Sequence, residues 1–220
     1  PIIEKVVELK KPIILSTGLS DIDEVIKTVK FIQNLDNNYK NPEMLCILQC
    51  TSMYPIRYSD VNLNVMSKYK ELFKLSVGYS DHTNDMNALK IAASMGADVL
   101  EFHFTDDKLN TNFRDHIVSL SKRDVKTLKN FLDLLDKIKG NTHKKLMEIE
   151  YENDNHVSFR RGVYLKKPIK KGEIIRRNNM IFLRPLMGTD ARLYKELDGS
   201  IALKDIKPLK AIYRDIDYKI

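Results

Sequence analysis

The sequence lacks any run of about 18 consecutive apolar residues, the length that a membrane-spanning helix needs. It shows no secretory signal pattern, and only two of its 220 residues are cysteine. Cys46 and Cys50 lie in one apolar run, where a strand would hold them about 13 Å apart, whereas a disulfide joins Cα atoms within about 7 Å. These absences argue against a membrane protein and against a disulfide-stabilised secreted fold. They predict free thiols in the reducing cytoplasm.

The composition is that of an ordinary globular protein, with 43% hydrophobic and 30% charged residues. Enough apolar residues are present to bury a core, which excludes a disordered chain. Lys and Arg number 37 against 30 Asp and Glu, so the net charge is +7, but the basic residues are scattered. Nucleic-acid binding predicts a basic stripe with interleaved aromatic residues, so we expect no nucleic-acid partner. A solvated surface and the attraction of small anionic substrates both remain open.

Residues 11–139 alternate between short apolar runs and helical patterns. The runs cover residues 12–16, 44–49, 75–78 and 99–104, and each precedes a segment with apolar positions at helical spacing. Strands of this kind predict an α/β fold whose parallel strands are buried on both faces. A complete eight-unit barrel takes about 250 residues, so four units predict half of a TIM barrel. An open doubly wound sheet is the alternative, but no Gly-x-Gly-x-x-Gly follows any of the runs.

The polar residues 141–158 predict a linker between residues 1–140 and a small β-rich domain over residues 159–220. That second domain contains a faint repeat, because Lys167-Pro168-Ile169-Lys170 recurs 37 residues later as Lys204-Asp205-Ile206-Lys207. The chain begins at Pro1, without Met, and we therefore expect it to be a fragment of a longer protein.

Two histidines follow neighbouring strands of the predicted sheet. His82 comes just after the third apolar run and His103 lies at the end of the fourth. Successive strands of a parallel barrel are neighbours, so both imidazoles are expected at the carboxyl rim, where barrel active sites lie. Two histidines with oxygen ligands suit a divalent ion such as Mn²⁺ or Fe²⁺. The alternative is two unrelated polar residues in loops.

Other candidate residues also follow strands, each with a structural alternative. Asp115 lies in the loop after the fourth run and is either a rim carboxylate or part of a turn. Ser52 and Tyr54 lie in the loop after the second run, where they suit a polar substrate or simply form the loop. Arg184 ends an apolar strand in the small domain, where it either binds an anion or lies on the surface. We expect His116 to be a packed or exposed loop histidine.

Taken together, the motifs resemble those of the sialic acid synthase family, the nonulosonic acid synthases. In the first part of the chain the resemblance rests on Leu15-Ser16-Thr17-Gly18, Cys50-Thr51-Ser52-Met53-Tyr54-Pro55, Gly78-Tyr79-Ser80-Asp81-His82-Thr83, Glu101-Phe102-His103-Phe104-Thr105 and Phe113-Arg114-Asp115-His116. In the small domain, Ile169-Lys170-Lys171-Gly172-Glu173 and Arg184-Pro185 resemble the antifreeze-like (SAF) domain of that family. The motifs cover nearly the whole chain in the order of the family.

The resemblance implies a cytoplasmic transferase that condenses phosphoenolpyruvate with an N-acylated hexosamine of the N-acetylmannosamine type. The product would be a nine-carbon 2-keto sugar acid, with release of phosphate and dependence on Mn²⁺ or another divalent ion. Pseudaminic, legionaminic and sialate-9-phosphate synthases are alternatives within the family. A non-catalytic module for dimerisation or glycan binding is the alternative outside it.

The resemblance also assigns roles to residues of this sequence. His82 and His103 match metal ligands, and Ser80 matches a contact to phosphoenolpyruvate. Ser52, Tyr54 and Asp115 match residues at the sugar, with Tyr54 and Asp115 at the reacting centre. Arg184 matches an arginine that reaches the sugar of the partner subunit in a domain-swapped homodimer.

The sequence departs from the family pattern at three points. Ser52 stands where some members carry Asn, and Leu209 stands where the second half of the SAF repeat has a small turn residue. The first four strands of the barrel, with the lysines that bind phosphoenolpyruvate and a catalytic glutamate, lie outside this sequence. We therefore expect the parent protein to be active and this chain alone to be inactive.

Overall fold

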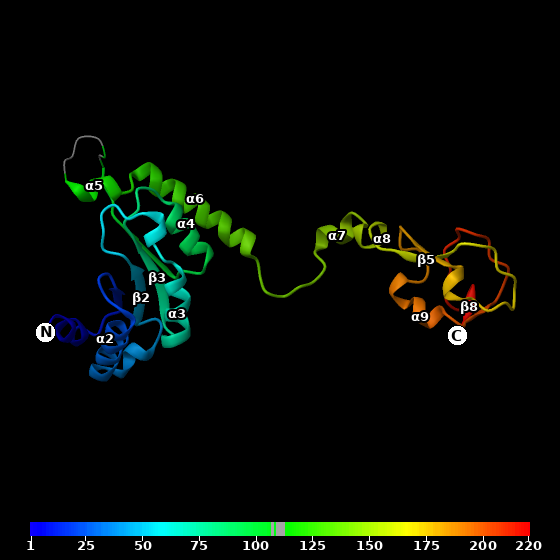
Figure 1. The fold of residues 1–220 in the computed structure, drawn as a ribbon, viewed down its shortest axis with the longest axis horizontal. Helices are drawn as coiled ribbons and strands as arrows, with labels where there is room; N and C mark the ends of the chain where they lie inside the picture. The colour runs from blue at the N-terminus through cyan, green and yellow to red at the C-terminus, as the bar shows by residue number, and fades with distance from the viewer. Residues whose placement is uncertain (107, 109–112) are drawn as a thin grey trace. The chain divides into compact units, whose positions relative to one another are not determined.

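The computed structural model describes residues 1–106, 108 and 113–220 of the chain. These form two compact units, residues 1–141 (unit 1) and residues 142–220 (unit 2), and each has its own hydrophobic core. Unit 1 alternates strands with helices, whereas unit 2 consists mainly of short strands, turns and single helical turns (Figure 1). Among the described helices, none has both the length and the apolar character needed to cross a membrane.

Unit 1 is built on four parallel strands in the order β1-β2-β3-β4, namely β1 (Ile13–Ser16), β2 (Leu45–Cys50), β3 (Ser76–Asp81) and β4 (Val99–Phe102). Its helices are α1 (Ile2–Glu8), α2 (Ile22–Leu35), α3 (Asn64–Phe73), α4 (Asn87–Ser94), α5 (Arg114–Val118) and α6 (Lys122–Lys139), with 3-10 turns at Asn37–Lys40 and Tyr58–Asp60. Strands that follow one another in sequence are also neighbours in space, which is the arrangement of half a βα barrel. The predicted parallel order is confirmed.

The start of helix α2 follows from its sequence. Asp21 accepts a hydrogen bond from the backbone N–H of Glu24 at 2.9 Å, and the Glu24 carboxylate accepts one from the backbone N–H of Asp21. This reciprocal capping satisfies two N–H groups that the first turn cannot pair. The apolar stripe of the helix then buries Val25, Val29 and Ile32. Helix α1 was not predicted, because its seven residues are too few to show a periodic pattern.

The two faces of the sheet differ. Alternate side chains of β2 and β3, among them Ile47 and Val77, belong to the core that the helices cover. The opposite face is covered only at the central strands, since Ile14 of β1 is 56% exposed and Glu101 of β4 is also exposed. Burial on both faces was therefore the wrong expectation for the outer strands β1 and β4. The uncovered face is the one that a barrel would enclose.

Unit 2 contains two antiparallel ribbons, β5 (Gly162–Leu165) with β6 (Met180–Leu183) and β7 (Ile201–Ala202) with β8 (Tyr218–Lys219). Its helices are α7 (Glu148–Glu152), α8 (Asn155–Ser158) and α9 (Tyr194–Leu197), with 3-10 turns at Arg177–Asn179 and Ala191–Leu193. Residues 141–158, the predicted linker, thus contain the two short helices α7 and α8. Local contacts hold them, such as the ring contact of Tyr151 with His156 at 4.8 Å.

The repeat of 37 residues is visible in the hydrogen bonds of unit 2. Ile169 and Ile206 each donate a backbone hydrogen bond to the other, at 3.0 and 2.8 Å. Gly172 donates to the carbonyl of Ala202, and Leu209 donates to the carbonyl of Leu165, both at 2.8 Å. Gly172 and Leu209 are 37 positions apart, and so are Leu165 and Ala202. The two hydrogen bonds are therefore equivalent, and the unit has an approximate internal two-fold symmetry. Gly172 and Leu209 occupy equivalent turns, with φ angles of 86° and 57°.

We expect Leu209→Gly to stabilise unit 2 by about 0.5–1 kcal/mol. A side chain at positive φ costs about 1–2 kcal/mol, part of which the greater freedom of glycine in the unfolded chain offsets. Leu209 is 63% exposed, so removing its side chain loses little apolar burial. Urea unfolding followed by amide signals of unit 2 measures the change. Gly172→Ala is the matched control and should destabilise the unit, whereas loss of stability in Leu209→Gly would contradict the symmetry argument.

Candidate functional site

The two strand-end histidines lie side by side at the carboxyl end of the sheet. Ser80 pairs with Glu101 and Asp81 with Phe102 in the β3–β4 register, so His82 and His103 are the next residues of the two strands. Their ring centroids are 5.2 Å apart, with the planes tilted by 60°. The sequence prediction that the two imidazoles meet is confirmed. Their role as metal ligands stays a prediction.

His82 is held from one side by the loop after β2. His82 is 5% exposed, and its Nδ1 atom lies 3.0 Å from the Thr51 carbonyl oxygen and 4.0 Å from the Cys50 Sγ atom. A carbonyl oxygen only accepts, so this contact places the proton on Nδ1 and leaves the lone pair on Nε2. Burial alone would lower the pKa of His82, but the hydrogen bonds to Cys50 and to Thr51 raise that pKa above its ordinary value.

Tyr54 completes a cluster of three rings. Its ring centroid lies 4.1 Å from that of His82 and 5.6 Å from that of His103, where the two planes are nearly perpendicular. The loop that carries Tyr54 is tied to the strand end, because the backbone N–H of Ile56 donates to the His82 carbonyl at 3.0 Å. Of the sequence candidates, Tyr54 is therefore in direct contact with both histidines.

The chemistry of this cluster suits a divalent cation in part. An imidazole whose Nδ1–H donates to a carbonyl presents Nε2 to a metal in a fixed orientation, which is the usual arrangement of histidine ligands. Within the described residues, however, no group of three or more His, Cys, Asp or Glu side chains is close enough to hold an ion. The two imidazoles therefore fit a site in which water, substrate or other residues supply the remaining ligands.

Ser80 and Glu101 form a polar pair on the same face of the sheet, each two residues before one of the histidines. The sequence analysis did not single out Glu101. Ser80 is 3% exposed, and its hydroxyl donates to the Glu101 carboxylate at 2.8 Å. Glu101 lies two residues before His103, so in a strand both side chains point to the same face. The alternation of side chains along a strand was therefore the signal that would have identified Glu101 from the position of His103. The pair makes the face beneath the histidines polar and negatively charged.

Ser52 lies at the rim where the loops after β1 and β2 meet. A Cβ atom added to Gly18 would lie 2.0 Å from the Ser52 Oγ atom and 3.3 Å from the Cys50 Sγ atom. With Ser52 in this position, only glycine fits at residue 18. The neighbouring Thr17 hydroxyl contacts the Leu48 carbonyl at 2.8 Å and the Tyr69 hydroxyl at 2.9 Å, which fixes the start of this loop.

The remaining candidates lie in other elements. Asp115 is half-buried in α5, in the segment after β4, and its carbonyl accepts a hydrogen bond from the Ser119 hydroxyl. His116 is half-buried and lies in α5, so the expectation of a loop histidine was wrong; its Nδ1 atom lies 2.8 Å from the Thr105 hydroxyl. Arg184 belongs to unit 2, where it is exposed and its guanidinium carbon lies 5.7 Å from the Phe159 ring centroid.

Comparison with known families and proteins adds to this geometry. A family model described as the NeuB family matches residues 1–144, and a SAF domain model matches residues 160–215. The chain is 40% identical to an uncharacterized protein of Methanocaldococcus jannaschii, over 87% of the chain and 55% of that protein. It is 38% identical to the N,N'-diacetyllegionaminic acid synthase of Campylobacter jejuni, over 94% of the chain and 60% of that enzyme. The chain thus spans little more than half the length of these relatives.

Among solved structures, a spore coat polysaccharide biosynthesis protein E from Chromobacterium violaceum matches the fold. Its TM-score is 0.76, and the match covers 100% of this chain and 64% of that one. At 20% identity this likeness concerns the fold alone. The predicted fold class, half of a βα barrel followed by a SAF domain, is confirmed by the two family models together with the strand order.

The contact between Gly18 and Ser52 leads to a test by paired substitution. We expect Gly18→Ala to destabilise the chain by about 1 kcal/mol, because the new methyl group forces the Ser52 hydroxyl out of its place. In the double variant with Ser52→Ala, the added methyl group of residue 18 no longer meets an oxygen atom, so most of that cost should vanish. Urea unfolding of the four proteins in this cycle measures the coupling. Additive effects of the two substitutions would show that the rim contact is not tight.

Proposed function

Because the chain belongs to the NeuB family and carries a SAF domain, we propose that the whole protein condenses phosphoenolpyruvate with an N-acylated hexosamine. In this reaction C3 of phosphoenolpyruvate forms a bond to the aldehyde carbon of the open-chain sugar. Water adds at C2, the C2–O bond to the phosphoryl group breaks, and inorganic phosphate leaves. The product is a 2-keto sugar acid with nine carbons. The observation that carries the proposal is the contact of two imidazoles with Tyr54 at adjacent strand ends.

In this proposal His82 and His103 hold a divalent cation, of which Mn²⁺ is the first candidate. Such a cation polarises a carbonyl oxygen and stabilises the negative charge that develops on it. The Thr51 carbonyl orients the His82 ring so that Nε2 is the free nitrogen. Because the pKa of His82 is raised, a proton competes for the same nitrogen. Cation binding should therefore weaken as the pH falls.

The other candidates are proposed to position the two substrates. Tyr54, in contact with both histidines, would orient the sugar near its aldehyde, and Ser52 would contact the sugar at the rim. Ser80 would bind phosphoenolpyruvate beneath the histidines, for which its hydroxyl would turn away from the Glu101 carboxylate that accepts from it here. Asp115 and Arg184 are proposed as further contacts to the sugar, with Arg184 supplied by the partner subunit of a domain-swapped homodimer.

The similarity to a legionaminic acid synthase favours a particular class of acceptor sugar. The Campylobacter jejuni relative, 38% identical over 94% of this chain, is named for a product with two N-acetyl groups. We therefore propose an acceptor with one or more acylamino substituents. Pseudaminic acid and sialate-9-phosphate synthesis are the alternatives within the same reaction type.

We expect the 220-residue chain to release no phosphate on its own. Half a barrel leaves Ile14 and Glu101 exposed on the face where the substrates would be enclosed. The measurement is phosphate release from phosphoenolpyruvate with N-acetylmannosamine and Mn²⁺, with the full-length protein assayed in parallel. Turnover by the short chain at the rate of the full-length protein would overturn this expectation.

In the full-length protein, His82→Ala and His103→Ala should each lower phosphate release by at least about 100-fold and abolish its dependence on Mn²⁺. Each imidazole would supply one ligand, so the loss of either would remove much of the affinity for the cation. The control is His156→Ala in unit 2, where the ring contacts Tyr151, and its activity should be unchanged. If Mn²⁺-dependent turnover persists in either of the first two variants, the assignment of the metal ligands is wrong.

A further inference from the structure

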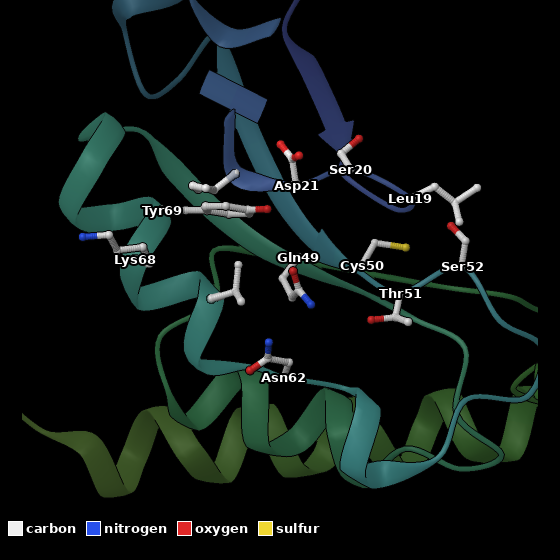
Figure 2. Close-up of a pocket in the computed structure, with 12 residues that line it drawn as sticks. Leu19, Ser20, Asp21, Gln49, Cys50, Thr51, Ser52, Asn62, Lys68 and Tyr69 are labelled. Atoms are coloured by element: carbon white, nitrogen blue, oxygen red, sulfur yellow. The ribbon is translucent and has the colours of Figure 1, made fainter. Parts of the chain in front are cut away.

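Hydrogen bonds close the loop between β2 and α3 at its base. The buried Gln49 side chain donates to the Val61 carbonyl at 3.1 Å, and the Thr51 hydroxyl donates to the Asp60 carbonyl at 3.0 Å. Figure 2 shows Gln49 and Thr51 at the carboxyl end of β2, with Asn62, where the loop returns, facing Gln49. These bonds fix the two ends of the loop to each other, but they leave the orientation of the residues between them to other contacts.

The middle of this loop is held by the loop that follows β3. The backbone N–H of Ile56 donates to the His82 carbonyl at 3.0 Å, and Ile56 is 6% exposed and belongs to the core of unit 1. Two residues further along, the Tyr58 hydroxyl donates to the Asp85 carboxylate at 2.5 Å. We call the pair of Tyr58 and Asp85 the clasp. It joins the loop that carries Tyr54 to the loop that carries His82.

The Asp85 side of the clasp is itself held in place. Its Oδ1 atom accepts from the backbone N–H of Asn87 at 2.8 Å, and its Oδ2 atom accepts from the Asn87 side-chain amide at 2.9 Å. The Thr83 hydroxyl lies 2.9 Å from the Asp85 carbonyl oxygen, and the Thr83 backbone N–H donates to the buried Asp81 carboxylate at 3.0 Å. Because Asp81 and Thr83 flank His82, the clasp is connected to the backbone on both sides of that histidine.

The clasp lies at the surface, so its role is not to form the core. Tyr58 is 60% exposed. Its hydrogen bond to Asp85 raises the pKa of the Tyr58 hydroxyl above its ordinary value, because the carboxylate stabilises the protonated phenol. Substitutions at exposed positions usually change the free energy of unfolding very little. Opening the clasp should therefore leave unit 1 folded and change only how the two loops are held together.

Tyr54 lies between the two ends of the held loop, four residues before Tyr58. Its ring centroid is 4.1 Å from that of His82 and 5.6 Å from that of His103. We propose that the clasp of Tyr58 and Asp85 positions this ring against both histidines before a substrate binds. Without the clasp the loop has more conformations, and part of the binding free energy of the sugar is then used to order Tyr54. Both members of the clasp act through Tyr54, so this assignment rests on the proposed function.

The first test is Tyr58→Phe in the full-length protein, which removes the hydroxyl and keeps the ring. We expect the KM for N-acetylmannosamine to rise about fivefold, the effect of losing one hydrogen bond, while the KM for phosphoenolpyruvate stays within about twofold. In an Asp85→Ala background, Tyr58→Phe should have no further effect, because its partner is already absent. Tyr213→Phe, at a tyrosine of unit 2 that is 38% exposed, is the matched control and should change neither KM. Equal kinetics for Tyr58→Phe and Tyr213→Phe, or the same effect of Tyr58→Phe with and without Asp85, would overturn the clasp.

A measurement without substrates separates this proposal from the proposed function. The Tyr54 ring, 4.1 Å from the His82 ring, shifts the NMR signals of that imidazole through its ring current. This shift should decrease in Tyr58→Phe and stay unchanged in Tyr213→Phe. If it decreases while the unaltered full-length protein releases no phosphate, the proposed function fails and the placement of Tyr54 by the clasp stands. An unchanged shift in Tyr58→Phe would overturn the clasp, whatever happens to the KM, and so would a decreased shift with an unchanged KM for the sugar.

Discussion

The pairing of β3 with β4 is the constraint on which the arrangement of the site depends. The register that joins Asp81 to Phe102 makes His82 and His103 the next residues of adjacent strands. A shift by one residue would turn one of the two imidazoles to the opposite face of the sheet. Gly78 contributes to this close pairing, because a Cβ atom at that position would lie 2.1 Å from the Val99 carbonyl oxygen. The absence of one side chain, four residues before His82, thus permits the contact between the two strands.

The alternation of side chains along β3 divides structural and chemical roles between its faces. Tyr79 and Asp81 point toward the helices, where the Asp81 carboxylate accepts from the Tyr79 hydroxyl and from the backbone and hydroxyl of Thr83. Burial raises the pKa of Asp81, although these hydrogen bonds act in the opposite direction. The end of the strand is therefore fixed from the helix side. Ser80 and His82 lie on the other face and take no part in these hydrogen bonds of Asp81.

Much of this arrangement could be predicted from the sequence because it depends on local patterns. The four apolar runs located the strands, and because successive strands of a parallel barrel are neighbours, the sequence predicted that His82 and His103 would meet. The exposure of Ile14 could not be predicted, because it depends on which segments cover the inner face rather than on the run that contains it. The same holds for the buried side chain of Gln49, whose hydrogen bond to the Val61 carbonyl joins two segments that are separate in the sequence.

The net positive charge of the protein is unevenly distributed between its two units. Unit 1 carries 19 basic and 19 acidic residues, whereas unit 2 carries 18 basic and 11 acidic residues, so the net charge of +7 belongs to unit 2. Composition alone left the attraction of small anions open beside the simpler interpretation of a solvated surface. In the proposed reaction one substrate is the anion phosphoenolpyruvate, and a charged surface raises the local concentration of oppositely charged molecules. Under the proposed function the net charge of unit 2 would act on that anion, and added salt would weaken the effect.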